Sequence, residues 1–202
     1  REGVPRDAEI YTLFAAKSGS GDNLGLPGAI ERSSKAIITA LTRLHPNAVI
    51  LIRAHPQAVE EPYIAEVLAS LGPEKAHLSL AHPEVLLALS RRCISNNPTN
   101  VLFTGFHGKS IDCSEYPDFH FKEHDEVSLA HGYGPLYINP LAKDFDSQMA
   151  RALEDDSLFE APELIEKRER LHHNNPPRFE ALLNLLEGAP PLREATVTAQ
   201  KI

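Results

Sequence analysis

The feature that most constrains the fold is a short, continuous apolar run, Ala48-Val49-Ile50-Leu51-Ile52. A strand that is apolar at every position is covered on both faces, which is typical of parallel sheets. Similar short apolar runs recur along the chain, at residues 11–16, 77–80, 93–95 and 110–113. Stretches of helical length separate them, at residues 33–44, 62–71, 84–92 and 99–106. This alternation predicts a Rossmann-like α/β domain, with a parallel sheet of about five strands and helices on both faces.

Local signals give the expected boundaries. The first helix should begin at residue 33, with Ser33 or Ser34 as its N-cap. Residues 116–140 are rich in Pro, Gly, His and acidic residues and predict an irregular loop. Helical patterns return at residues 144–155, 162–172 and 177–186. We therefore expect a Rossmann-like domain over residues 1–143 and a helical appendage over 144–202.

Composition excludes several classes of protein. The 202 residues carry a formal net charge of -8, which opposes the electrostatic binding that nucleic-acid proteins use. No apolar run approaches the roughly 20 residues that a membrane-spanning helix needs, and no signal peptide is visible, so we expect a cytoplasmic protein. Cys93 and Cys113 lack the spacing of a zinc site and are expected to be buried. The start at Arg1 and the single Met149 predict a piece of a longer protein.

Polar residues that follow the predicted strands are the first candidates for a binding site, because ligands of parallel sheets bind at the carboxyl ends of the strands. The loop after the first strand contains Ser18, Gly19, Ser20 and Gly21. Small residues let backbone N–H groups approach a phosphate. The loop matches no established phosphate-binding pattern, and a plain flexible connection is the alternative.

Arg53, His55 and Pro56 are expected directly after the apolar run of residues 48–52. Arg53 can bind a phosphate through two N–H groups, and His55 can donate to a phosphate or ribose oxygen. The alternative is that His55 caps the following helix. A second His-Pro pair, His82-Pro83, is expected chiefly to cap the helix after it.

The stretch Ser95-Asn96-Asn97-Pro98-Thr99 follows the fourth predicted strand and opens a helix. Its hydroxyls, amides and free N–H groups favour anion binding at a positive helix end, although Ser and Asn are also common helix caps. His120, His124 and His131 lie among carboxylates, but their spacing fits no known metal-ligand pattern. We therefore expect no metal and no cofactor.

Three of these elements, taken in order, resemble bacterial glycosyltransferases of capsules and surface polysaccharides. The segment Leu51-Ile52-Arg53-Ala54-His55-Pro56, preceded by His45-Pro46-Asn47, resembles their His-Pro motif. Residues 95–99 resemble their Ser/Thr motif, and Gly108-Lys109 before a strand resembles a third element. The family includes CMP-Kdo-dependent capsule enzymes and sialyltransferases.

The resemblance implies the C-terminal, donor-binding half of a GT-B fold. His55 would then hydrogen-bond the phosphate of a CMP-sugar and stabilise the departing CMP, as the catalytic residue of this half. Arg53, Pro56, Ser95, Asn96, Asn97, Thr99 and residues 18–21 would line the donor site. The expected partners are a sugar nucleotide and an N-terminal acceptor-binding half. Two alternatives stay open: half of a UDP-sugar epimerase or transferase, and a non-catalytic binding module.

Overall fold

The computed structural model describes residues 4–5, 7–18, 26–56, 59–96, 110–115, 136–166 and 169. Its centre is a sheet of six strands in the order β3-β2-β1-β4-β5-β6, with every neighbouring pair parallel. The strands are β1 (Ile10–Ala15), β2 (Val49–Ala54), β3 (Ala76–Leu78), β4 (Arg92–Ser95), β5 (Ser110–Asp112) and β6 (Leu136–Tyr137). The predicted Rossmann-like fold class is confirmed.

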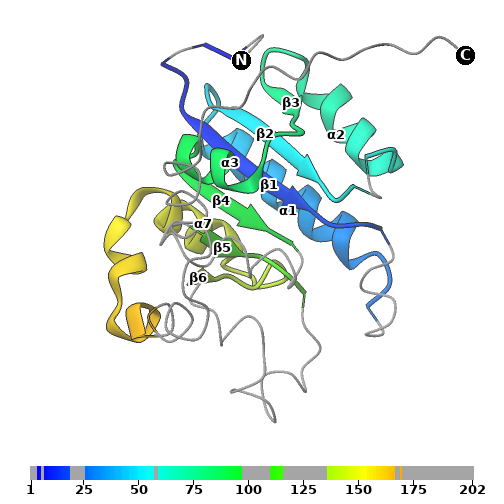
Figure 1. Cartoon of the computed structure of the whole chain (residues 1–202). Helices are drawn as coiled ribbons and strands as arrows, with labels where there is room; N and C mark the ends of the chain where they lie inside the picture. Colours follow the sequence, from blue (N-terminus) through cyan, green and yellow to red (C-terminus); the bar gives the residue numbers. More distant parts are fainter. Residues whose placement is uncertain are drawn as a thin grey trace, which may run out of the picture.

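Helices cover both faces of this sheet (Figure 1). On one face, α1 (Ala29–Leu44), α2 (Pro62–Leu71) and α7 (Phe145–Glu154) share the larger hydrophobic core with alternate residues of the strands. On the other face, α3 (Pro83–Leu89) packs against a smaller cluster that includes Phe14, Val49 and Leu51. Because β1 and β2 contribute to both clusters, they are apolar at nearly every position.

Several predicted boundaries differ from the structure. Helix α1 begins at Ala29, not at residue 33, and its N-cap is Gly28 in the left-handed conformation (φ 70°). Ser33 and Ser34 are buried inside the helix, where the Ser33 hydroxyl donates to the Ala29 carbonyl at 2.8 Å. The prediction of a serine cap was wrong, because a left-handed glycine can begin a helix without a side-chain cap.

Two further corrections concern strands. β2 extends to Ala54, so Arg53 lies within the strand and only His55 and Pro56 follow it. The sheet also has a sixth strand, β6, inside the stretch that was expected to be an irregular loop. Two residues carry too little pattern to be recognised, and their pairing with β5 comes from tertiary structure. The predicted helix at residues 99–106 lies outside the described residues.

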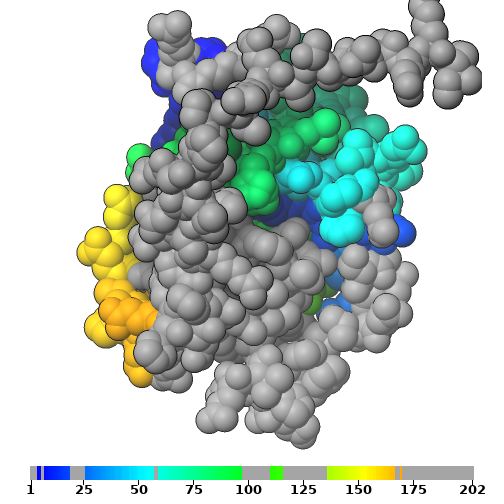
Figure 2. Space-filling view, viewed as in Figure 1, coloured from blue at the N-terminus to red at the C-terminus, as the bar shows by residue number. Residues whose placement is uncertain are grey.

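α7 is joined to the sheet by a buried cation. Arg92 is 4% exposed, donates to the Ala152 carbonyl at 3.0 Å and pairs with Asp156. Its guanidinium also stacks over Phe159, in the short 3-10 helix Asp156–Glu160 that follows α7. Figure 2 shows this part of the chain (yellow to orange) on the opposite side of the molecule from α2 (cyan). Among the described residues, no helix is long and apolar enough to cross a bilayer.

Candidate functional site

The carboxyl ends of the strands meet at one edge of the sheet. After β1 the chain moves outward through β2 and β3, and then crosses back to β4 on the other side of β1. The sheet order therefore reverses between β1 and β4, the place where parallel sheets leave a crevice for ligands. Backbone bonds continue past the strands here: His55 N–H donates to the Ala15 carbonyl at 2.9 Å, and Cys113 N–H to the Ser95 carbonyl at 2.7 Å.

Hydrogen bonds of the Asn96 and Tyr63 side chains meet at Ala16, beside the switch point. The Asn96 side chain accepts from Ala16 N–H at 3.1 Å and donates to the Ser34 hydroxyl at 2.6 Å. The Tyr63 hydroxyl donates to the Ala16 carbonyl. These bonds join the end of β1 to α1, to the first turn of α2 and to the end of β4.

Burial raises the pKa of the Tyr63 hydroxyl, and the charges of Glu61 and Glu31 act in the same direction. Tyr63 therefore remains a protonated donor across the physiological range. The Asn96 and Tyr63 side chains are thus both fixed against the backbone of Ala16 at the site edge.

A second connection crosses from α1 to the end of β5. Arg32 donates two hydrogen bonds to Glu115, from Nε at 3.2 Å and from Nη2 at 2.6 Å, and a third to the Pro27 carbonyl at 2.6 Å. The Glu115 side chain is 1% exposed, whereas that of Arg32 is 49% exposed. A two-pronged arginine contact is the arrangement that best stabilises a buried carboxylate. Glycine is favoured at position 28, because a Cβ there would lie only 3.1 Å from Arg32 Nη1.

Asp112 is the last residue of β5 and is fully buried. Its Oδ1 accepts from the Ser114 backbone N–H at 3.0 Å and from the Ser114 hydroxyl at 2.5 Å. Burial and the nearby Asp112 charge raise the pKa of Tyr137, whose hydroxyl donates to the Ser114 carbonyl at 3.3 Å. Burial likewise raises the pKa of the Cys113 thiol, which lies among apolar groups beside Met149. Buried polar side chains therefore follow β5 at this edge.

The predicted site residues that the structure describes all lie along this edge. His55 and Pro56 are exposed after β2, Ser18 follows β1, and Ser95 and Asn96 are buried at the end of β4. Arg53 lies within β2 and donates to the carbonyls of Ala81 (3.1 Å) and Ala54 (2.7 Å). The other predicted residues lie outside the described part of the chain: Gly19, Ser20, Gly21, Asn97, Thr99, His120, His124 and His131.

The two His-Pro pairs have different surroundings. His82 is the N-cap of α3, and its Nδ1 accepts from Glu84 N–H at 3.3 Å, which confirms the predicted capping role. Helix α2 has Glu61 as its N-cap, so the alternative that His55 caps the following helix is wrong. The difference follows from the number of residues between each histidine and the next helix.

Five residues of this edge were not predicted as such from the sequence: Ser34, Tyr63, Arg32, Glu31 and Glu115. Glu115 carried a usable signal, because it follows a predicted strand as Ser95 and His55 do. Glu31 and Arg32 carried none, since the start of α1 was placed four residues too late, and Tyr63 carried none because only packing brings α2 to this edge.

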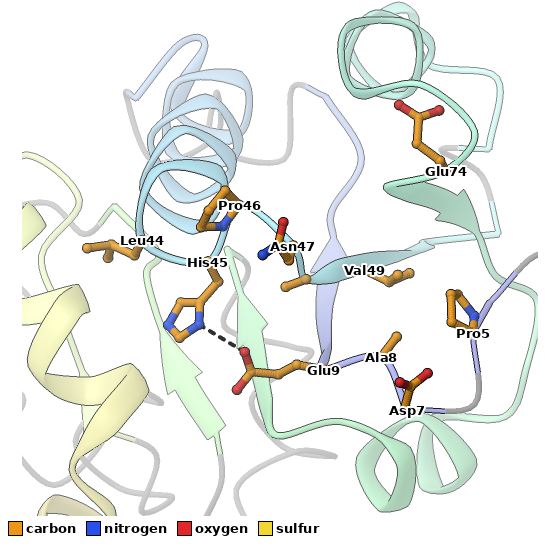
Figure 3. Close-up of a pocket in the computed structure, with 11 residues that line it drawn as sticks. Pro5, Asp7, Ala8, Glu9, Leu44, His45, Pro46, Asn47, Val49 and Glu74 are labelled. Atoms are coloured by element: carbon orange, nitrogen blue, oxygen red, sulfur yellow. Dashed lines mark hydrogen bonds and ion pairs between the residues drawn. The ribbon is translucent and has the colours of Figure 1, made fainter.

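A hollow of about 550 Å³ lies at the opposite edge, by the amino ends of β1, β2 and β3 (Figure 3). Asp7, Glu9 and Glu74 stand around it, and His45 lies 2.9 Å from Glu9. An anionic lining of this kind repels phosphate.

Comparisons with known proteins support the fold. No family model matches the sequence, and no curated protein matches it. Among solved structures, the UDP-GlcNAc 2-epimerase from Neisseria meningitidis bound to UDP-GlcNAc has a TM-score of 0.54 at 14% identity, over 90% of this chain and 45% of that one. TarM has a TM-score of 0.50 at 12% identity, over 91% of this chain and 36% of that one. The chain thus has the glycosyltransferase-like fold of one GT-B domain and spans less than half of either protein.

Proposed function

We propose that this chain is the donor-binding half of an enzyme that uses a sugar nucleotide. The observation that carries the proposal is the reversal of strand order between β1 and β4, with buried polar groups fixed around it. A rigid polar edge at such a crevice is typical of nucleotide sites in parallel sheets. The N-terminal acceptor-binding half would belong to the same protein or to a partner.

The donor class has two candidates. The resemblance of residues 51–56 and 95–99 favours a CMP-sugar of the Kdo or sialic-acid type, used in surface-polysaccharide synthesis. The epimerase with a similar fold is bound to UDP-GlcNAc, which favours a UDP-sugar. In either case His55 would donate to the donor phosphate from the end of β2, with Pro56 fixing the chain direction.

Calorimetric titration of the 202-residue chain with CMP, UDP, GDP and ADP tests the proposal. We expect a pyrimidine nucleotide to bind and to raise the melting temperature. A ligand at about 100 times its Kd stabilises a protein by about 2.7 kcal/mol. The preferred base separates the two donor classes, and failure of all four nucleotides to bind would reject the proposal.

A further inference from the structure

Both backbone groups of Ala16, the residue that follows β1, are held by side chains from distant parts of the chain. The Ala16 N–H donates at 3.1 Å to Asn96, which follows β4 and lies 80 positions later. The Ala16 carbonyl accepts from the hydroxyl of Tyr63, which lies 47 positions later, in the first turn of α2. The backbone at the end of β1 is therefore fixed from the β4 side and from the α2 side.

A third bond fixes the carbonyl of the residue before Ala16. The Ala15 carbonyl accepts from His55 N–H at 2.9 Å and continues the ladder between β1 and β2. Three hydrogen bonds thus hold two successive peptide groups, on either side of Ala16. All three partners belong to the chain itself, so the fold alone orients the end of β1.

The bond from Tyr63 sets the direction of the next backbone N–H, that of Lys17. The C=O and N–H of a trans peptide point in opposite directions, and the peptide bond between Ala16 and Lys17 is trans. The Ala16 carbonyl points toward α2, which lies beside β3 (Figure 1). The Lys17 N–H therefore points away from α2, toward β4 and the point where the strand order reverses.

A backbone N–H held in this place is suited to bind a phosphate. Phosphate oxygens accept strong hydrogen bonds from backbone N–H groups, and a donor that is already oriented loses little entropy on binding. The exposed Lys17 side chain adds a positive charge beside the N–H. The hydroxyl of Ser18, by contrast, donates to the Glu31 carboxylate, so a phosphate is expected at Lys17 rather than at Ser18.

The Tyr63 hydroxyl is suited to hold the Ala16 carbonyl over a wide pH range. Burial raises the pKa of Tyr63, so the hydroxyl keeps the proton that it donates. Its ring is held independently, because it packs against the larger hydrophobic core. A phenylalanine at this position keeps that packing and removes only the hydrogen bond.

We propose that Tyr63 is a positioning residue for the donor: by holding the Ala16 carbonyl, it aims the Lys17 N–H at a phosphate of the sugar nucleotide. The inference rests on the proposed function, and it deepens it by placing one phosphate between the ends of β1 and β4. His55 and the Lys17 N–H then flank the end of β1.

The test separates the phosphate from the rest of the ligand. The probes are UDP, CMP and their nucleosides, uridine and cytidine, titrated into the 202-residue chain labelled with ¹⁵N-lysine. The Lys17 amide signal is identified by its loss in Lys17→Arg. In the wild-type protein we expect the preferred nucleotide to move this signal downfield, as a hydrogen bond to phosphate does, and its nucleoside to leave the signal in place.

Tyr63→Phe should weaken binding of the nucleotide about 10-fold, because the Lys17 N–H loses its alignment with the charged phosphate, and should leave the nucleoside affinity unchanged. The matched control is Tyr11→Phe. It removes a hydroxyl that lies 3.1 Å from His45 Nδ1, at the amino edge of the sheet. This control should lower the melting temperature without changing either affinity.

The inference is overturned if Tyr63→Phe weakens nucleotide and nucleoside equally, if it changes neither affinity, or if the nucleotide leaves the wild-type Lys17 signal in place. In each case the wild-type protein still binds a nucleotide, and the proposed function stands. If the wild-type protein binds no nucleotide, both fail together. Should a thermal melt show that Tyr63→Phe is unfolded, the wild-type Lys17 signal alone decides.

Discussion

The side-chain oxygen of Asn96 accepts a 3.1 Å hydrogen bond from the backbone N–H of Ala16, which lies 80 positions earlier in the chain. Its amide nitrogen donates at the same time to Ser34 and to the Ile30 carbonyl. One buried side chain therefore holds together three elements of the candidate site: β1, α1 and β4.

Replacing Asn96 with Ala should destabilise the protein by about 3 kcal/mol, because the Ala16 N–H would remain buried without an acceptor. A urea melt measures the loss. The matched control is Asn139→Ala, which removes an exposed side chain that accepts from Leu141 N–H. This control should change the free energy of unfolding by less than about 1 kcal/mol. Equal losses of stability in the two variants would contradict the structural role of Asn96.

The Arg32–Glu115 pair should respond unequally to loss of its partners. Arg32→Ala leaves the buried Glu115 carboxylate without its cation and should cost about 2 kcal/mol. Glu115→Ala leaves a half-exposed guanidinium that water can solvate, and should cost about 1 kcal/mol. Denaturant melts of the two variants give the comparison. A larger loss of stability in Glu115→Ala than in Arg32→Ala would contradict this explanation, which rests on the burial of Glu115.

His55→Ala should weaken binding of the preferred nucleotide by about 10- to 100-fold, as expected for loss of a hydrogen bond to a charged group. The second His-Pro pair provides the control. His82→Ala removes the cap of α3 and should lower stability by about 1 kcal/mol without changing affinity. Titration calorimetry and a melt on both variants test this assignment. Unchanged affinity in His55→Ala would remove His55 from the site.

Alkaline pH should destabilise the fold through its buried tyrosines. Burial raises the folded-state pKa values of Tyr63 and Tyr137 above the ordinary tyrosine value of about 10. Above about pH 10 the unfolded chain loses these protons first, so the unfolded state is favoured and stability falls as pH rises. The slope is at most about 1.4 kcal/mol per pH unit for each tyrosine. Unfolding free energies measured from pH 8 to 11 should show a smaller slope in Tyr63→Phe, and an unchanged slope would refute this linkage.

The sheet could be predicted from the sequence because its strands are short apolar runs between helical stretches. Residues 48–52 alone indicate a strand that is covered on both faces. β6 could not be predicted, since two residues pair with β5 only when the rest of the sheet exists.

The candidate site was predictable only at its strand ends. His55, Ser18 and Asn96 follow strands, and the rule that ligands bind at carboxyl ends identifies them without a structure. Tyr63 and Ser34 lie on helices, and their meeting depends on how α1 and α2 pack on the sheet. The role of Asn96 is also more structural than its motif indicated, because its amide bonds to neighbouring elements.

The contacts of Arg92 also bear on how the chain is made. Its acceptors, Ala152 and Asp156, lie 60 and 64 positions later, so at about 5–20 residues per second a ribosome needs about 3 to 13 seconds to supply them. During that interval strands β1 to β4 can pair, and Asn96 can bond to Ala16, Ile30 and Ser34, while the Arg92 guanidinium still lacks its acceptors. The part of the candidate site that Asn96 holds can therefore form in the nascent chain before Arg92 has its acceptors, whereas Asp112 and Glu115 join the same edge only later.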